Sequence, residues 1–488
     1  MAFIRKKKMP SGKIYAYEVR SVWDAEKKQS RAVSKYLGIV NVDGSITMKS
    51  TADERKVQQR IKKLSIQKER LIQNFGNGFL ITESIKKSAI YQPLIELFEK
   101  KPALLALMAY RLCQPGAPMY NAHVWMQGNF LHAEKKIPPL SSQDISRLLA
   151  FLGDESVQRE FFGRYLTMEE KHSKNIIIDA TSLPNQSASD FNAWGYASGS
   201  VETQFRFHCV VDQVTKKPLF YRHLPGNITD VSTLQTTIQE LKKQGFQYNF
   251  ALMDAGYCSE SNIHILRENN IDFLMRLTAK TRLYQDMIRQ HASTLENMSN
   301  VVNYGKRTLF AQVVKHDLYG APGYSYLLLD PEKKVKDIQG LIEKRNVQPE
   351  EERDDETDKY LFSKAGIFIL ISSKEIPKQD ILEAYYTRQS IEQIFGFAKD
   401  DLDCLPLRCH SENTIRGYLF LQFLLLIVFI EIRQKLFNHF TVDQAILITS
   451  ALKCKIYSDQ LIIPELTKEQ KKIFALADIL VPIEIAGI

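Results

Sequence analysis

The stretch NIIIDATSL, residues 175–183, begins with a run of apolar residues that ends at an aspartate, Asp179. A second run, FQYNFALMDAG at residues 246–256, reaches Asp254 in the same way. Both runs have the length and composition of buried strands. Acidic residues are poor strand formers, and a carboxylate beside a buried run costs free energy unless a partner compensates for it. Either aspartate alone is most simply a strand-end turn residue, but the two together indicate a site.

The segments between and after these runs predict a mixed α/β sheet. Two alternating segments indicate strands, and a helix capped by Thr229 or Asp230 follows them. The strand that ends at Asp254 then leads into a short helix and a further strand. Three strands, a helix and then alternating strand and helix favour a mixed sheet covered by helices. These elements are expected at residues 175–183, 204–214, 217–226, 229–245, 246–254, 259–270 and 271–278.

The segment YYTRQSIEQIFGFAKDDLD, residues 385–403, follows another predicted strand and has the spacing of one helix. Its polar positions are Tyr385, Arg388, Glu392 and Lys399. At about 100 degrees per residue these four lie at roughly 0, −60, −20 and −40 degrees, so they share one face over roughly 21 Å. The opposite, apolar face holds Ile391, Ile394 and Ala398. A polar stripe of this length suits an extended polyanion running past a metal.

Asp179, Asp254 and Glu392 supply three carboxylates, which are the ligands that hard divalent cations take. Two such ions about 3.5–4 Å apart can activate an attacking hydroxyl and stabilise the leaving oxygen of a phosphoryl displacement. Arg388 and Lys399 suit phosphates on either side, one as a bidentate fork and the other as a point charge. The simpler alternative is that Arg388 and Glu392 form a helix-surface salt bridge of about 0.3–0.5 kcal/mol.

Charge is concentrated at one end of the 488-residue chain. Residues 1–75 hold 18 Lys and Arg against 7 Asp and Glu, whereas the whole chain has a net charge of +9. A basic region of this kind favours an acidic partner such as nucleic acid, the alternative being a merely solvated basic surface.

The cysteines and the apolar runs indicate an intracellular protein. The six cysteines show no CxxC spacing, and the loose group of Cys404, Cys409 and His410 lacks a fourth zinc ligand, so reduced thiols are expected. The first residues carry charges without an apolar segment behind them, which argues against a signal peptide. Residues 417–432 are strongly apolar but are interrupted by Gln422 and short for a membrane span. They predict a buried core helix and no membrane partner.

The remaining segments predict smaller modules. Residues 13–40 alternate around a polar turn as a basic β-hairpin, and residues 51–73 have a charged helical pattern. Residues 141–166 indicate two short helices, with Ser141 or Ser142 as the cap of the first and a break at Gly153 and Asp154; a DNA-reading helix-turn-helix is one interpretation and an ordinary helix pair the other. Residues 279–364 alternate as an antiparallel β insert with an acidic surface loop at 349–359.

These motifs resemble those of a known family. The spacing Tyr385-x2-Arg388-x3-Glu392-x6-Lys399 is similar to the YREK signature of bacterial DDE transposases of the insertion-sequence-four superfamily. The resemblance extends to four further segments and covers residues 175–430. They are DATS at Asp179, LPGNITD at Leu224–Asp230, DAGYCSESNI at Asp254–Ile263 and LPLRCHSENTIRGYLFLQFLLLIVF at Leu405–Phe429.

The resemblance implies an RNase H-like fold and a metal-dependent reaction on DNA. Asp179, Asp254 and Glu392 would be the catalytic, metal-binding residues for two Mg²⁺ ions, with Mn²⁺ as a substitute. Tyr385, Arg388 and Lys399 would bind DNA. Relatives nick a transposon end, form and open a hairpin, and join the 3′ end to target DNA. The expected partners are double-stranded terminal inverted repeats, target DNA and a second copy of the chain, in the nucleoid of a bacterial cytoplasm.

The expected fold class is therefore α/β, an RNase H-like mixed-sheet core interrupted by a β-rich insertion. The expected regions are a basic β-hairpin module at 1–50, a helical DNA-binding region at 51–172, the core at 173–278 and 365–430, the insertion at 279–364, and a helical C-terminal region at 431–488.

Some relatives stack an extruded base on a tryptophan, but Trp23, Trp125 and Trp194 all lie outside the insertion. The hairpin route therefore stays open. The aromatic substitutes in the insertion are Tyr304, Tyr319, Tyr324 and Tyr326. Asn227 and Asp230 are either neighbours of the metals or simply a turn residue and a helix cap.

Two other functions remain as alternatives: a nuclease that uses the same core for hydrolysis alone, and a DNA-binding protein descended from a transposase. A glycosidase also uses two carboxylates, but it gives no reason for Arg388, Lys399 and the basic N-terminal region.

Overall fold

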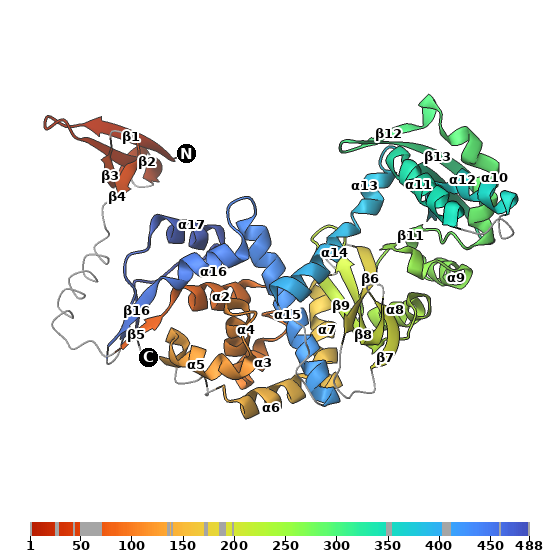
Figure 1. The fold of residues 1–488 in the computed structure, drawn as a ribbon. Coiled ribbons are helices and arrows are strands. Elements are labelled where there is room, and N and C mark those ends of the chain that lie inside the picture. Colours follow the sequence, from red (N-terminus) through yellow and green to blue (C-terminus); the bar gives the residue numbers. More distant parts are fainter. Residues whose placement is uncertain are drawn as a thin grey trace. The chain divides into compact units, whose positions relative to one another are not determined.

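The computed structural model describes residues 2–24, 29–41, 44–48, 71–133, 137, 140–169, 174–184, 192–197, 200–347, 354–402, 411–457 and 460–486. The chain divides into two compact units (Figure 1). The smaller unit comprises Met1–Gln73, Cys454–Pro464 and Pro482–Ile488, and the larger comprises Asn74–Lys453 and Glu465–Val481.

The smaller unit is built from β-strands. Its first sheet is antiparallel, in the order β1-β2-β3-β4, and its strands are β1 Ala2–Lys8, β2 Ile14–Asp24, β3 Gln29–Val40 and β4 Ile46–Met48. The pairing of β2 with β3 confirms the hairpin predicted within residues 13–40. The second sheet has the order β18-β17-β16-β5. Its strands are β5 Leu71–Asn74, β16 Lys453–Ile456, β17 Gln460–Ile462 and β18 Glu484–Ala486.

This second sheet corrects two predictions. Most of the charged helix predicted at 51–73 lies outside the described residues, but its last residues form β5 and are not helical. The C-terminal region at 431–488 is helical only in part, because β16, β17 and β18 lie within it. Strand β16 alternates exposed and buried positions, the period of a strand at a sheet surface, which outweighs helical propensity here.

The larger unit contains a ten-stranded mixed sheet in the order β12-β13-β14-β15-β11-β10-β6-β8-β7, with β9 also paired to β8. Strands β6, β10 and β11 are parallel neighbours, and the other pairings are antiparallel. The predicted mixed sheet is thus confirmed. Its strands are β6 Asn175–Pro184, β7 Ala193–Ala197, β8 Ser200–Asp212, β9 Pro218–Pro225, β10 Phe250–Met253, β11 Asp272–Arg276, β12 Val301–Tyr304, β13 Arg307–Asp317, β14 Pro322–Leu329 and β15 Ile367–Ser372.

The larger unit also contains helices that precede, interrupt and follow this sheet in the sequence. Those before it are α2 Gly76–Lys87, α3 Ile95–Lys100, α4 Ala103–Cys113, α5 Ala122–Gln127, α6 Ser142–Leu152 and α7 Glu155–Glu169. Those within and after it are α8 Asp230–Lys243, α9 Glu260–Glu268, α10 Arg282–Leu295, α11 Pro331–Val347, α12 Asp355–Lys364, α15 Glu412–Leu436, α16 Val442–Ser450 and α17 Lys468–Leu476.

The insertion at 279–364 is mixed rather than β-rich. It holds β12, β13 and β14, but also helices α10, α11 and α12. The predicted acidic loop at 349–359 is wrong over its second half, where α12 begins at Asp355. The Asp354 side chain accepts a hydrogen bond from the Glu356 amide, and three acidic residues occupy the first turn. Acidic residues there are favourable because they face the positive end of the helix dipole.

Helix α15 is the core helix of the larger unit. Among the described residues, it is the one helix long and apolar enough to cross a membrane, and 89% of its most apolar window is buried inside the protein. This confirms the predicted core helix. Its approach to α6 is very close, since a Cβ on Gly417 would lie 1.8 Å from the Leu149 carbonyl oxygen. A Cβ on Gly153 would lie 1.9 Å from the Asn413 carbonyl oxygen.

The predicted helix pair at 141–166 corresponds to α6 and α7. Ser141 caps α6 through a capping box with Asp144, and the pair breaks at Gly153. Phe161 and Phe162 on α7 pack against Phe420 of α15 with ring centroids 5.2 and 6.2 Å apart. The pair therefore contributes to the core, and its reading of DNA stays a prediction.

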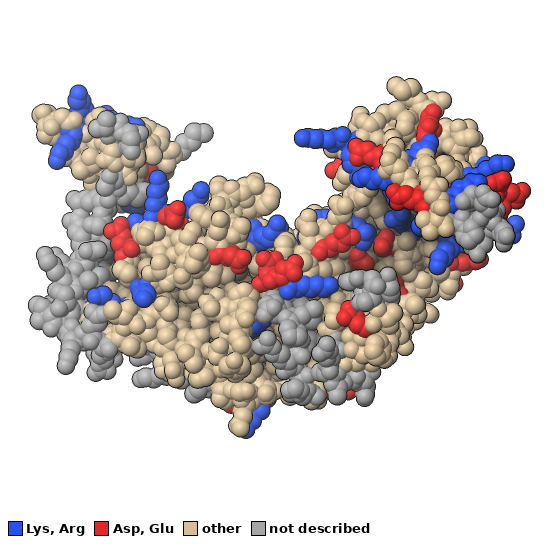
Figure 2. Space-filling model, viewed as in Figure 1, with Lys and Arg blue, Asp and Glu red and all other residues tan. Residues whose placement is uncertain are grey.

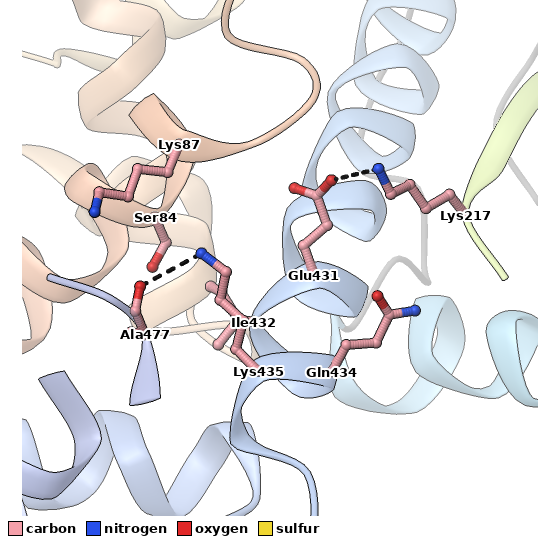
Figure 3. Close-up of a pocket in the computed structure, with 8 residues that line it drawn as sticks. All are labelled: Ser84, Lys87, Lys217, Glu431, Ile432, Gln434, Lys435 and Ala477. Carbon is pink, nitrogen blue, oxygen red and sulfur yellow. Dashed lines mark hydrogen bonds and ion pairs between the residues drawn. The ribbon is translucent and has the colours of Figure 1, made fainter. Parts of the chain in front are cut away.

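A cavity of about 350 Å³ lies beside α15 (Figure 3). The Lys217 ammonium pairs with the carboxylates of Glu431 at 3.1 Å and Glu169 at 3.4 Å, and Lys435 donates to the Ala477 carbonyl at 3.4 Å. Burial lowers the pKa of Lys217, but the two carboxylates raise it above its usual value. These ion pairs connect the start of β9 with α7 and α15, and we assign them a structural role. The lining residues are Ser84, Lys87, Lys217, Glu431, Ile432, Gln434, Lys435 and Ala477.

Candidate active site

Two of the predicted carboxylates lie at the same edge of the sheet. Strands β6 and β10 are parallel neighbours, and Ile178 lies opposite Met253 in their register. Asp254 directly follows β10, whereas Asp179 is the next residue within β6, which continues to Pro184, so the prediction that Asp179 ends its strand is wrong. The parallel pairing therefore brings together two carboxylates that are 75 positions apart in the sequence.

The segment predicted as one helix at 385–403 is broken. It consists of α13 Ile381–Tyr386, α14 Gln389–Gly396 and a π-helical turn at Phe397–Asp401. Between the two helices the amides of Arg388, Ser390 and Ile391 bond to carbonyl oxygens three residues back, at 3.0, 3.1 and 2.9 Å. The helical backbone thus becomes a tight turn after Tyr386 and a wider π-helical turn after Gly396. The prediction of one continuous α-helix is therefore wrong.

All four polar residues of this segment nevertheless reach the carboxylate edge. The Tyr385 hydroxyl donates to Asp254 Oδ1 at 3.1 Å. Arg388 bridges two carboxylates, with Nη1 2.8 Å from Asp179 Oδ2 and Nη2 2.7 Å from Glu392 Oε1. The predicted salt bridge between Arg388 and Glu392 is therefore present, but its cation is shared with Asp179.

Lys399 completes the group from the π-helical turn. Its ammonium donates to the Thr181 hydroxyl at 2.7 Å, two residues beyond Asp179 on β6. Ile391 and Ile394 are buried on the other side of α14, which fixes the orientation of the polar side. The structure thus brings all six predicted residues to one edge of the sheet.

Burial and like charges dominate the electrostatics at this edge. The Asp179 side chain is 13% exposed. Burial raises the pKa of Asp179 to about 6; Arg388 acts to lower it, whereas Asp254 and Asp230 raise it further. Burial opposes the charge of Arg388, but the carboxylates around it raise its pKa. Burial and then the charge of Asp254 raise the pKa of Tyr385, so its hydroxyl stays a donor.

The described domain matches a known family. A model of the transposase DDE domain matches residues 171–428, which is more than half of the chain and includes every residue of the carboxylate edge. The chain belongs to this family. Transposases of this family cut and join DNA, and DDE transposases generally use divalent metal ions.

Two solved transposase structures are similar to this transposase at low identity. The piggyBac transposase synaptic complex with hairpin DNA has 10% identity and a TM-score of 0.36, over 82% of this chain and 69% of that chain. The Drosophila P element transposase strand transfer complex has 11% identity and a TM-score of 0.19, over 68% and 65%. Both TM-scores are too low to carry an argument. No curated protein sequence matches significantly.

The donor set of the transposase fits divalent cations in its chemistry. Burial raises the pKa of Asp179, and the negative charge of the neighbouring Asp254 raises it further although Arg388 contacts Asp179; a bound cation would relieve this excess of negative charge. Within the part of the chain that the structure describes, no three His, Cys, Asp or Glu side chains are arranged to hold an ion. Arg388 occupies the space between Asp179 and Glu392 instead.

Asp230 is a fourth carboxylate that the transposase places beside this edge. Its side chain is 19% exposed and pairs with Arg206, with Oδ1 and Nη2 2.7 Å apart. Burial raises the pKa of Asp230, Arg206 lowers it and Asp254 raises it. The sequence signal was an aspartate at the start of a capped helix, which left a metal neighbour and a simple cap equally open. Asn227, by contrast, is exposed.

The structure distinguishes the tyrosines of the insertion that were predicted to stack on an extruded base. Tyr326 is fully buried, with its hydroxyl 2.9 Å from the Ile376 carbonyl oxygen, so it cannot stack on an extruded base. Tyr304 stacks on Tyr386 with ring centroids 4.9 Å apart, and Tyr386 adjoins the site residue Tyr385. Tyr304 therefore contacts a residue that is adjacent to the site residue Tyr385.

The cysteines of the transposase are consistent with reduced thiols. Cys113, Cys209, Cys258 and Cys454 are free and buried. The loose group of Cys404, Cys409 and His410 lies outside the described residues.

Proposed function

We propose that this transposase cuts and joins the ends of its own insertion sequence, and that it is a member of the insertion-sequence-four superfamily with a YREK signature. The observation that carries the proposal is the convergence of Tyr385, Arg388, Glu392 and Lys399 on Asp179 and Asp254, which the parallel pairing of β6 and β10 brings together. These residues would act on DNA as a homodimer bound to two paired ends.

In this proposal Asp179, Asp254 and Glu392 hold the metal ions, Mg²⁺ or Mn²⁺. When bound, such ions supply activation of the attacking hydroxyl and stabilisation of the leaving oxygen in phosphoryl transfer. Arg388 now bridges Asp179 and Glu392, so it would have to leave this position for both carboxylates to hold metal ions. The released guanidinium is then available to bind a phosphate with two parallel hydrogen bonds.

The other polar residues position the DNA and the carboxylates. Lys399 places a point charge beside Thr181, where it would hold a phosphate near Asp179. The Tyr385 hydroxyl orients the Asp254 carboxylate. The proposed sequence is nicking, attack of the 3′ hydroxyl on the opposite strand to form a hairpin, opening by water, and joining to target DNA. Tyr304 is the proposed platform for a base extruded on the hairpin route.

The pH dependence of DNA cleavage tests the role of Asp179. A protonated carboxyl does not hold a cation, and the pKa of Asp179 is raised to about 6, so we expect cleavage to fall as the pH drops through 6. Because protons and Mg²⁺ compete, a higher Mg²⁺ concentration should move the midpoint to lower pH. The measurement is the rate of nicking between pH 5 and 8 at two Mg²⁺ concentrations. DNA binding in EDTA is the control, and a profile that stays level through pH 6 would contradict the assignment.

The first sheet of the smaller unit is the proposed contact for DNA outside the active site. Residues 2–48 contain 10 Lys and Arg against 4 Asp and Glu, and every residue of β1 is exposed. Figure 2 shows blue side chains on this part of the chain. Cations on an exposed sheet bind phosphates and release counterions, which makes affinity depend on salt.

Salt titration tests this contact. Replacing Lys6 and Lys8 with glutamine is expected to reduce the slope of log affinity against log salt by about 0.9 for each phosphate that the sheet no longer neutralises. The matched control replaces Lys333 and Lys336, two exposed lysines of α11, and is expected to leave the slope unchanged. If the two double variants had the same slope of log affinity against log salt, the first sheet would not be the proposed contact for DNA.

A further inference from the structure

The turn that carries Asp254 is held from several sides. It forms a short 3₁₀ turn at Ala255–Tyr257 directly after β10. The Thr278 hydroxyl donates to the Ala255 carbonyl at 3.1 Å. The Asn262 amide donates to the carbonyl oxygens of Tyr257 at 2.8 Å and Val231 at 3.0 Å, so it ties the turn to the first residues of α8.

Asp230 fills the remaining side of this turn. A Cβ on Gly256 would lie 2.7 Å from Asp230 Oδ2, closer than Cβ contacts occur in proteins. Gly256 therefore leaves the space that the Asp230 carboxylate occupies. The other oxygen of that carboxylate is 2.7 Å from Arg206 Nη2 on β8, so the side chain is fixed at both ends.

A helix-capping role does not account for this arrangement. An acidic residue in the first turn of a helix contributes about 0.3–1 kcal/mol through the helix dipole, wherever it points. The carboxylate of Asp230 instead points at a half-buried arginine of the sheet and at the glycine two residues beyond Asp254. The contact therefore joins three parts of the chain: β8, α8 and the turn after β10.

We propose that Asp230 is a positioning residue that holds the Asp254 turn in the geometry required for phosphoryl transfer. Arg206 fixes the Asp230 carboxylate, and the carboxylate in turn sets the position of Gly256 and hence of Asp254. This inference rests on the proposed function: its kinetic readout depends on DNA cleavage, and its Mn²⁺ readout depends on the proposed metal site. Asp230 acts through shape and hydrogen bonding, so asparagine should replace it and alanine should not.

The first experiment compares Asp230→Ala, Asp230→Asn and the unchanged full chain. Asp230→Ala is expected to lower kcat for cleavage of a duplex carrying the terminal repeat by about tenfold to a hundredfold, because small misplacements of a reacting group have effects of this size. KM for the duplex should change by less than about twofold. The dissociation constant for Mn²⁺, measured from the free-ion spectrum without DNA, should rise by about tenfold. Asp230→Asn should restore both values to within about threefold of the unchanged chain.

The second experiment is a double-mutant cycle. Gly256→Ala in the unchanged chain is expected to weaken Mn²⁺ binding by about tenfold, because its Cβ would meet the Asp230 carboxylate. In the Asp230→Ala background the same change should add less than about twofold, because that carboxylate is absent. Asp443→Asn is the matched control, since Asp443 is also a first-turn acid, on α16, but is exposed, and should change neither value.

The outcomes separate this inference from the proposed function. Normal kcat and normal Mn²⁺ affinity in Asp230→Ala would overturn the inference, whatever its thermal stability. Asparagine as damaging as alanine would also overturn it, because charge and not position would then be required. If the unchanged chain neither cuts nor joins DNA, the proposed function fails, yet the Mn²⁺ cycle between Asp230 and Gly256 still tests the inference. If Asp230→Ala does not fold, Asp230→Asn and Gly256→Ala carry the test.

Discussion

Glu392→Gln is expected to lower DNA cleavage and strand joining by at least about a thousandfold while leaving DNA binding intact. Glutamine keeps the size of the side chain but removes the charge that the proposed metal site requires. The Glu392 side chain is 53% exposed, so its replacement should not disturb the core. Arg388 keeps its contact with Asp179 in the variant, and the strand ends should stay in place.

The assay uses a duplex that carries the terminal inverted repeat and flanking DNA, with Mg²⁺ or with EDTA. Glu383→Gln is the matched control, because Glu383 is an exposed carboxylate on α13 of the same segment. Metal-dependent cutting and joining that is lost only in Glu392→Gln would support the transposase. Cutting without joining by the unchanged chain would favour the nuclease, and salt-sensitive binding without any cut would favour a DNA-binding descendant. Activity retained in Glu392→Gln would remove Glu392 from the site.

Gly417→Val is expected to lower the free energy of unfolding of the larger unit by about 3 kcal/mol or more. A Cβ at this position would lie 1.8 Å from the Leu149 carbonyl oxygen, and a backbone oxygen within a helix cannot rotate away. The contact joins α15 to α6, so the strain would fall on the core helix of the unit.

Urea unfolding followed by far-ultraviolet circular dichroism measures this effect. The control is Gly340→Ala on α11, where no atom lies within 4 Å of the new Cβ. Alanine is favoured over glycine inside a helix by about 1 kcal/mol, so the control should be neutral or stabilised. A midpoint for Gly417→Val as high as that of Gly340→Ala would show that α6 and α15 separate easily, against the close packing described above.

The features predicted correctly from the sequence are those with local signals. Asp179 and Asp254 each follow an apolar run, so both the buried part of the strand and the aspartate after it are visible within about ten positions, although β6 continues beyond Asp179. The core helix at 417–432 was equally local, because no other segment is so uniformly apolar. The parallel pairing of β6 and β10 then places the two aspartates together.

The features that were missed depend on contacts or on backbone hydrogen bonds. The pairing of Asp230 with Arg206 joins the start of α8 to β8, and although the sequence singled out Asp230, it gave no signal for Arg206 as its partner. The break after Tyr386 arises from bonds three residues back, which side-chain periodicity does not record. In the insertion, the alternating pattern predicted the strands β13 and β14. Helix α11 of the same segment was not predicted, and it has no buried residue.

The insertion also has a structural role, because it covers one side of strand β15. All six of its residues are buried, and it is hydrogen-bonded to β14 of the insertion on one side and to β11 of the core on the other. Excision of the insertion would bare the β14 side of this strand. An uncovered apolar edge is a template for pairing with another chain, so a shortened transposase would be prone to aggregate. Substitutions in the outer helices of the insertion should therefore be tolerated better than substitutions in β14, the strand that covers this side of β15.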